Sequence, residues 1–403
     1  MYSYEQEVVE RDENTVHMNV GPSHPAMHGT LRVKMEVKGE RIVKAEQEIG
    51  FLHTGFEKLG EHRSYNQFIT LTDRLNYFSP LSNNIGFALA CEELLGITVP
   101  RRCQVIRTIL AEMSRLADHS LCVGAMTMDL GAFSSILWTF VEREKLYDVF
   151  EAVTGTRLTT SYTRVGGIAF DLPADFEKRV SGILDSMEKT LDSLRDSFYQ
   201  NRIFLDRTEG IGCISREMAM SHGITGPMGR ASGVDYDIRK YRPYLIYDEL
   251  KFEVPLYKEG DTLARYKVRI DEMEQSISLV RQALKLLEPG PINYQDQKKT
   301  LPDKTSTYRD MESLIHHFKL VMPGEDHGIH PPVIDQYAST EAPNGELGWH
   351  LVSDGTSNPY RVRIRPPSFI NYPVLTKLLE GAMLADLVAI LGSFNIIAGE
   401  LDR

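Results

Sequence analysis

The chain has 403 residues, a formal charge of −11, 42% hydrophobic and 25% charged residues, which is the composition of an ordinary globular protein. This acidity argues against nucleic-acid binding, which needs a basic footprint, and no run of about 18 apolar residues is present to span a membrane. The four cysteines form no C-x-x-C pair and the N-terminus resembles no signal or transit peptide, so we expect a reducing compartment such as a bacterial or archaeal cytoplasm or an organelle matrix.

The N-terminal part of the chain predicts an antiparallel sheet. Residues 31–38 alternate strictly between apolar and charged side chains, and residues 15–20 alternate in a similar way, as in strands with one buried face. A short turn at Gly39 leads to a third strand over residues 41–49. Between the first two strands, residues 21–29 (GPSHPAMHG) hold two prolines and two glycines, so we expect a stiff, non-helical loop.

The middle of the chain predicts a bundle of long helices. Apolar residues at helical spacing indicate helices over residues 105–117, 134–153, 174–198 and 261–288, without strands between them. Residues 289–310 are polar and rich in proline and glycine, which is typical of a linker.

The C-terminal part predicts short strands at residues 349–352 and 360–364 and a last helix over residues 374–391. The fold class is therefore α+β. We expect an N-terminal β domain that carries the stiff loop (residues 1–60), a helical core (61–290) and a C-terminal α+β region packed on that core (291–403).

Two histidines four residues apart, His24 and His28, form the first candidate site. Histidines at this spacing ligate zinc on a helix with a neighbouring glutamate, but this loop is not helical and offers no third ligand. Two ordinary loop histidines that bond to backbone groups are the alternative that the residues alone slightly favour. A rigid loop with groups that titrate near neutrality also suits proton delivery.

Other motifs do not decide a function by themselves. A tyrosine close to an arginine, as at Tyr77 and Arg74, is more often structural, and Asp129 after an apolar helix is usually a turn or cap residue. P-loop, G-x-G-x-x-G and iron–sulfur cysteine motifs are absent. Four further histidines are expected at the surface, with metal binding as the alternative: His316, His317, His327 and His330.

Several segments together resemble one family. These are GPSHPAMHGTLR, IGFLHTGFEKLGEHR, LTDRLNYFSP, SDGTSNPYRVRIRPPSF and the terminal GELDR. They resemble the D subunit of respiratory complex I, the 49-kDa type of mitochondria, from about Val9 to Arg403, and HTGFEK is the signature of that family. The resemblance implies a fold similar to the large subunit of nickel–iron hydrogenases.

Those hydrogenases hold their metal with two C-x-x-C pairs, at positions that resemble Asn76 and Ser79 and, near the C-terminus, Ile397 and Glu400. None of the four is a cysteine here, and soft thiolates are the ligands that such a metal needs. We therefore expect no metal on this chain, and the resemblance implies that the ancestral metal cavity holds a quinone head group instead.

The resemblance assigns roles to a few residues. Tyr77 resembles the tyrosine that bonds one quinone carbonyl, His28 resembles the histidine that meets the other, and Asp129 resembles the aspartate that pairs with this histidine. His24 lies in the same loop and is expected to line the quinone chamber, and Arg74 matches an arginine that faces the cluster-bearing partner. Two positions depart from the pattern: many members have aspartate in place of Asn76, and some have a cluster-proximal histidine in place of Thr159.

The implied activity is that of an NADH:quinone oxidoreductase. Quinone reduction takes two electrons and two protons. Tyr77 and a protonated His28 would supply the protons, because a nearby Asp129 carboxylate favours the imidazolium. The chain itself would bind no cofactor, and the resemblance places NADH, FMN and the iron–sulfur clusters on partner subunits. The expected partners are the cluster-bearing B subunit, the small hydrophilic C subunit, the ferredoxin-like I subunit and the membrane H subunit.

The implied location is the cytoplasmic side of the cell membrane, or the matrix side in mitochondria. Which quinone is used stays open. The alternative function is a hydrogenase-related large subunit of a membrane-bound complex without quinone chemistry. The tyrosine and histidine at the quinone positions argue against it.

Overall fold

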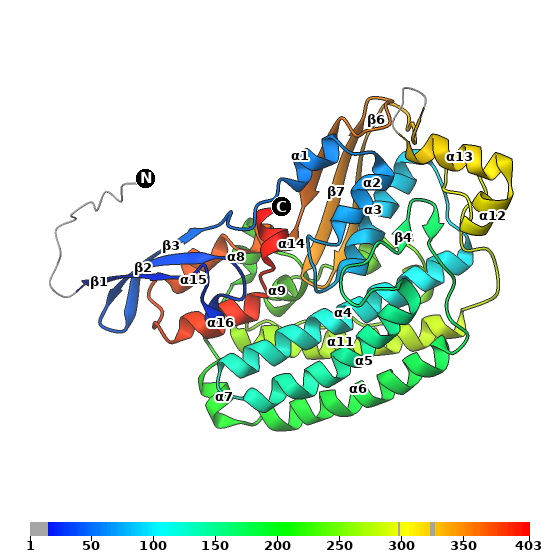
Figure 1. The fold of residues 1–403 in the computed structure, drawn as a ribbon. Helices are drawn as coiled ribbons and strands as arrows, with labels where there is room; N and C mark the ends of the chain where they lie inside the picture. The colour runs from blue at the N-terminus through cyan, green and yellow to red at the C-terminus, as the bar shows by residue number, and fades with distance from the viewer. Residues whose placement is uncertain (1–14, 297–298, 323–326) are drawn as a thin grey trace.

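The architecture is mixed α+β, as predicted (Figure 1). The computed structural model describes residues 15–296, 299–322 and 327–403. An N-terminal three-stranded sheet, a layer of long helices and a C-terminal three-stranded sheet follow one another along the chain. The predicted α+β class is confirmed.

The N-terminal sheet is antiparallel in the order β1-β2-β3. Val33, Met35 and Val37 are buried on one face of β2, as their alternation predicts. They share a hydrophobic core with C-terminal residues of α15 and α16, so the two ends of the chain fold as neighbours. The bounds are β1 Thr15–Val20, β2 Arg32–Lys38, β3 Arg41–Glu48, α15 Val374–Leu379 and α16 Asp386–Phe394.

The helical layer is built from α4 (Arg101–Asp129), α5 (Phe133–Thr154), α6 (Phe176–Phe198) and α11 (Thr262–Lys285), which confirms the four predicted helices. They lie side by side across the lower half of Figure 1. Gly124 lets α4 approach α5 closely, because a Cβ at this position would lie 2.3 Å from the hydroxyl oxygen of Thr139. α4 extends on both sides beyond the apolar residues of 105–117 that predicted it, from Arg101 to Asp129.

The C-terminal sheet is antiparallel in the order β6-β7-β8 and packs on α3. The strand predicted at residues 349–352 lies within β7, and the one predicted at 360–364 overlaps β8 with a shift of one residue, whereas α3 and β6 were not predicted. The bounds are β6 Ile334–Ala342, β7 Gly345–Ser353, β8 Arg361–Arg365 and α3 Pro80–Leu95. The remaining elements are short: η1 Pro25–Met27, α1 Phe56–Glu61, α2 Tyr65–Thr72, β4 Thr163–Arg164, β5 Gly167–Ile168, α7 Arg202–Asp206, α8 Arg216–Ser221, α9 Gly226–Ala231, α10 Ile238–Tyr241, η2 Tyr247–Glu249, α12 Lys304–Arg309, α13 Met311–Val321, α14 Pro367–Asn371 and α17 Ala398–Asp402.

Three local predictions were wrong. The expected linker at 289–310 includes α12, which begins where the Asp303 carboxylate accepts hydrogen bonds from two backbone N–H groups. The expected last helix is two helices, because Gly381 and Ala382 leave the helix to pair with Ile42 of β3. The stiff loop contains a single 3-10 turn that begins at Pro25, where a missing N–H has no cost.

A buried ion network joins the helical layer to the C-terminal sheet. Arg230 of α9 is fully buried and donates to Glu272 of α11 at 2.7 Å and to Glu341 of β6 at 2.8 Å. Both carboxylates are also buried, and Glu272 contacts His119 at 2.9 Å as well, so the guanidinium supplies charge compensation inside the fold. The network therefore fixes the orientation of the sheet relative to the helices.

Candidate functional site

A small cavity of about 230 Å³ lies where the N-terminal loop, α4 and the segment after α16 meet. Its volume is below the roughly 300–1,000 Å³ of pockets for drug-sized ligands, so it suits a single ring better than a nucleotide. The lining is mostly apolar and includes Phe78, Ile396 and Ile397, and its polar groups are few. Among these are two of the predicted residues, His28 and Tyr77.

The loop before β2 holds His28 in place. Met27 is completely buried beside it, and η1 packs against α16 (Figure 1). His28 itself has a φ of 48°, the left-handed conformation that few residues other than glycine adopt. Such strain persists only where the surroundings impose it. The loop therefore presents the imidazole in one defined direction.

That direction is toward Asp129. The Nε2 atom of His28 contacts the Oδ2 atom of Asp129, and both side chains are mostly buried. Asp129 is the last residue of α4, where the helix dipole disfavours a negative charge. The imidazole is the group in contact with this carboxylate, so the pair places a side chain that can carry a proton at the cavity wall. Gly392 lies against the pair, because a Cβ there would be 3.5 Å from each of the two contacting atoms.

Tyr77 approaches the cavity from the segment between α2 and α3. Burial raises the pKa of its phenol, and the nearby Asp118 carboxylate raises it further, so the hydroxyl keeps its proton at neutral pH. Asn76 anchors this segment: its amide nitrogen donates to Asp118 at 2.9 Å, and its amide oxygen accepts from the backbone of Phe78 and Ser79. The departure at Asn76 therefore gives Asp118 a neutral donor.

Sequence reasoning missed several residues of this site. Cys122 and Ala125 of α4 line the cavity, as do Gly392 and Asn395 near the C-terminus. The spacing of 118, 122, 125 and 129 places Asp118 and Asp129 on one helical face with these lining residues. That spacing was an available signal, but from the residues alone Asp129 was interpreted as a turn or cap residue after the helix.

The structure does not bring every predicted residue to the cavity. His24 is exposed and is not among the residues that line it, so its assignment to quinone stays a prediction. Arg74 is also exposed, 3.8 Å from the carboxylate of Asp73. Thr159 accepts a hydrogen bond from Thr156 through its backbone oxygen. Its effect on a partner's cluster stays open.

All four positions that resemble hydrogenase cysteines are buried near this site: Asn76, Ser79, Ile397 and Glu400. Within residues 15–296, 299–322 and 327–403, no group of three or more His, Cys, Asp or Glu side chains is arranged to hold a metal ion.

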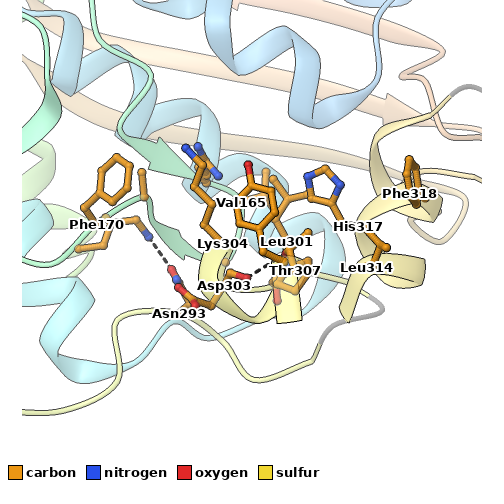
Figure 2. Close-up of a pocket in the computed structure, with 17 residues that line it drawn as sticks. Val165, Phe170, Asn293, Leu301, Asp303, Lys304, Thr307, Leu314, His317 and Phe318 are labelled. Carbon is orange, nitrogen blue, oxygen red and sulfur yellow. Dashed lines mark hydrogen bonds between the residues drawn. The ribbon is translucent and has the colours of Figure 1, made fainter. Parts of the chain in front are cut away.

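A second cavity, of about 330 Å³, lies far from the first, between β4–β5 and α12–α13 (Figure 2). His317 lines it, with Lys304 of α12. Two of its polar side chains stabilise local structure. The Asn293 side-chain oxygen accepts a hydrogen bond from the backbone N–H of Ile168, and the Asp303 carboxylate caps α12. No acid–base pair faces this cavity in the described part of the chain. The first cavity is therefore the better candidate for proton transfer.

Comparison with known proteins gives a consistent result. The family described as "Respiratory-chain NADH dehydrogenase, 49 Kd subunit" matches residues 129–403. The chain belongs to this family. Relatives named as the D subunit of NADH-quinone oxidoreductase include that of Geotalea uraniireducens, 47% identical over 96% of this chain and 98% of the relative. That of Chloroherpeton thalassium is 48% identical over 97% and 88%, and that of Methylacidiphilum infernorum 47% over 96% and 91%.

This 49-kDa family member is thus a subunit of a multi-subunit NADH:quinone oxidoreductase, as the sequence predicted. In the parts of the chain that the structure describes, no helix is long and apolar enough to cross a membrane.

Proposed function

We propose that the 230 Å³ cavity is the chamber in which the head group of a quinone is reduced and protonated. The observation that carries this proposal is the convergence of the Tyr77 phenol and the His28–Asp129 pair on one small, mostly apolar cavity. An apolar wall fits a quinone ring, and two proton donors match its two carbonyl oxygens.

The chemistry follows from the residue types. As two electrons reach the ring, the Tyr77 hydroxyl donates its proton to one carbonyl oxygen, and the His28 imidazolium donates a ring proton at the other. A raised phenol pKa keeps the Tyr77 proton in place until negative charge develops on the quinone. After His28 has lost its proton, Asp129 faces a neutral imidazole, and this change in charge is the signal that we propose the subunit passes to the membrane part of the complex.

The electrons come from elsewhere in the complex in this proposal. An iron–sulfur cluster in the neighbouring B subunit supplies them. The small hydrophilic, ferredoxin-like and membrane subunits are the other expected neighbours, on the cytoplasmic or matrix side of the membrane. A hydrogenase-related subunit without quinone chemistry is the less favoured function, because the relatives at 46–48% identity carry the name NADH-quinone oxidoreductase.

The test is Tyr77→Phe in the assembled enzyme, which keeps the ring and removes the hydroxyl. Loss of one donor at a site of developing charge costs about 10²–10³ in rate. We expect a smaller loss, at least about tenfold, because water substitutes in part and His28 remains. The NADH:ferricyanide rate should be unchanged, because it does not require the chamber.

The matched control is Tyr266→Phe, which removes a buried hydroxyl that has no hydrogen-bond partner and lies in an aromatic cluster of the helical layer. It should leave quinone reduction intact. A parental rate for Tyr77→Phe with every quinone tested would show that the chamber lies elsewhere.

A further inference from the structure

Behind the cavity, four polar side chains form a connected line. The Asn395 amide nitrogen donates to the Asp118 carboxylate and to the Asn344 amide oxygen, each at 2.7 Å. Asn395 also lines the cavity. The amide of Asn344 in turn faces the carboxyl of Glu400 in α17. The line therefore runs from the wall of the chamber to a carboxyl that the proposed mechanism does not use.

The Glu400 carboxyl is completely buried. Its Oε2 atom accepts hydrogen bonds from the backbone N–H and from the hydroxyl of Ser368. Within the described residues, its Oε1 atom and the Asn344 amide nitrogen form no hydrogen bond of standard geometry, although the amide lies close enough to act on the carboxyl. One oxygen of this carboxyl is therefore available to hold a proton.

Two buried carboxyls thus share one polar line without an ion pair. Among the described residues, neither Asp118 nor Glu400 forms an ion pair with Arg, Lys or His. The groups around Asp118 are the phenols of Tyr77 and Tyr147 and the thiol of Cys122. Arg269 of α11 is near Cys122, but it donates to the backbone oxygens of Arg265 and Phe394. Negative charges on both of these buried carboxyls are energetically unfavourable, and one bound proton removes this unfavourable interaction.

We propose that Glu400, joined by this polar line to the Asp118 carboxylate, holds one exchangeable proton at neutral pH and delivers it to Tyr77 after each quinone reduction. The use of this proton rests on the proposed function of the cavity. Tyr77 gives its phenolic proton to the quinone and becomes a phenolate. Glu400 then loses its proton, which moves to the phenolate through water in the chamber, and Glu400 regains a proton from solvent. The electrons are those of the established NADH:quinone reaction.

The acidities give this transfer its direction. Burial raises the pKa of Glu400 to about 7 and the charge of Asp118 contributes to the rise, while the hydrogen bonds from Ser368 and Asn344 oppose it. Burial and the charge of Asp118 also raise the pKa of Tyr77 above its ordinary value of 10. A proton therefore moves favourably from the Glu400 carboxyl to the Tyr77 phenolate.

The test is Glu400→Gln in the assembled enzyme in membrane vesicles, with NADH:quinone activity measured against pH. Below pH 7 the parent holds the stored proton and the variant does not, so we expect a loss of about tenfold there. Above pH 8 Glu400 is ionised in the parent as well, so the difference should shrink. Asp402→Asn is the matched control in the same helix, because Asp402 accepts from the backbone of Gly50 and Leu52. It should keep the parental pH profile.

Ser368→Ala provides a second variant. It removes a hydrogen bond that stabilises the Glu400 carboxylate, so the pH at which activity declines should move upward. A pH titration by infrared spectroscopy should show a protonated-carboxyl band that Glu400→Gln removes, and this signal does not depend on turnover. The band would persist even if Tyr77 proved not to be a donor, which separates this proposal from the proposed function.

A parental pH profile in Glu400→Gln would overturn the proposal, and so would an equal loss of activity at every pH. Absence of a titrating carboxyl band that belongs to Glu400 would also overturn it.

Discussion

At the scale of single residues, the proposed chemistry depends on one imidazole and one carboxylate. His28 is held in a left-handed backbone conformation and contacts Asp129, which lies at the unfavourable end of a helix for a negative charge. His28 offsets the unfavourable interaction of the Asp129 carboxylate with the helix dipole. Asp129 in turn gives a partner to the imidazole of the strained loop. The pair therefore links the protonation of His28 to the geometry of the whole N-terminal loop.

Replacement of Asp129 by Asn should slow quinone reduction. The variant removes the carboxylate that contacts the Nε2 atom of His28, so the positive charge of a proton-donating imidazole loses its partner. The measurement is the NADH:quinone rate in assembled enzyme, with the NADH:ferricyanide rate as a check of assembly.

Asp335→Asn is the control for this experiment. Asp335 forms a similar pair with His350, but that pair is exposed on the C-terminal sheet, away from the cavity. The control should keep the parental rate. A parental rate in Asp129→Asn would remove the assignment of His28 as a proton donor.

At the scale of elements, α4 is the support of the site. It contributes Asp118, Cys122, Ala125 and Asp129 from one face, while its opposite side packs on α5 and α11. Its position depends on close contact with α5 at Gly124. A displacement of α4 here would move the cavity wall, because Ala125 is the next residue.

Gly124→Ala tests this close contact. Its methyl group would lie 2.3 Å from Thr139 Oγ1 and 3.1 Å from the Cα of Ile136. Overpacking of this kind lowers the free energy of unfolding by about 1–3 kcal/mol. Gly182→Ala in α6 is the matched control: a Cβ there meets nothing within 4 Å. The control should stabilise by about 0.5–1 kcal/mol, because alanine suits a helix interior better. Thermal unfolding of both variants gives the comparison, and equal effects would contradict the account of α4–α5 packing.

The sequence predicted the elements whose pattern is local. The alternation of Val33, Met35 and Val37 and the apolar face of α6 are each visible within one segment. The break at Gly381 was not predictable in this way, because its cause is pairing with β3, more than 300 residues earlier. Tyr77, His28 and Asp129 were found through family resemblance. Asp118 and Asn395 were missed because their meeting across 277 positions is a property of the fold.

At the scale of the whole molecule, Arg230 is the most informative charge. It is fully buried and binds carboxylates on a helix and on a strand that belong to different layers. It is the main reason that the pKa of Glu272 lies well below its ordinary value of 4.5, against the opposing effect of burial. Glu272 therefore stabilises the fold above pH 4.5, and this contribution is lost as the pH falls.

Arg230→Met should lower the free energy of unfolding by about 3–5 kcal/mol at neutral pH, because it leaves Glu272 and Glu341 without their counterion. The difference in unfolding free energy between variant and parent should decrease below pH 4.5. There the carboxyls of the variant take up protons, and the parent loses the stability that its ion pairs contribute. Urea unfolding at both pH values measures this. A deficit that does not depend on pH would indicate lost packing rather than lost charge.

The shared core of the N-terminal sheet and the C-terminal helices also has a consequence for biosynthesis. A ribosome releases β2 and β3 long before it releases residues 374–401, which cover their apolar face. During translation the sheet cannot bury Val33 and Met35 in their final surroundings, and His28 has no packed α16 beside it. The nascent chain therefore exposes this apolar face for most of its synthesis. The cavity beside His28 is complete only after the last residues of the chain, which include Ile396 and Ile397 of its lining, have been made.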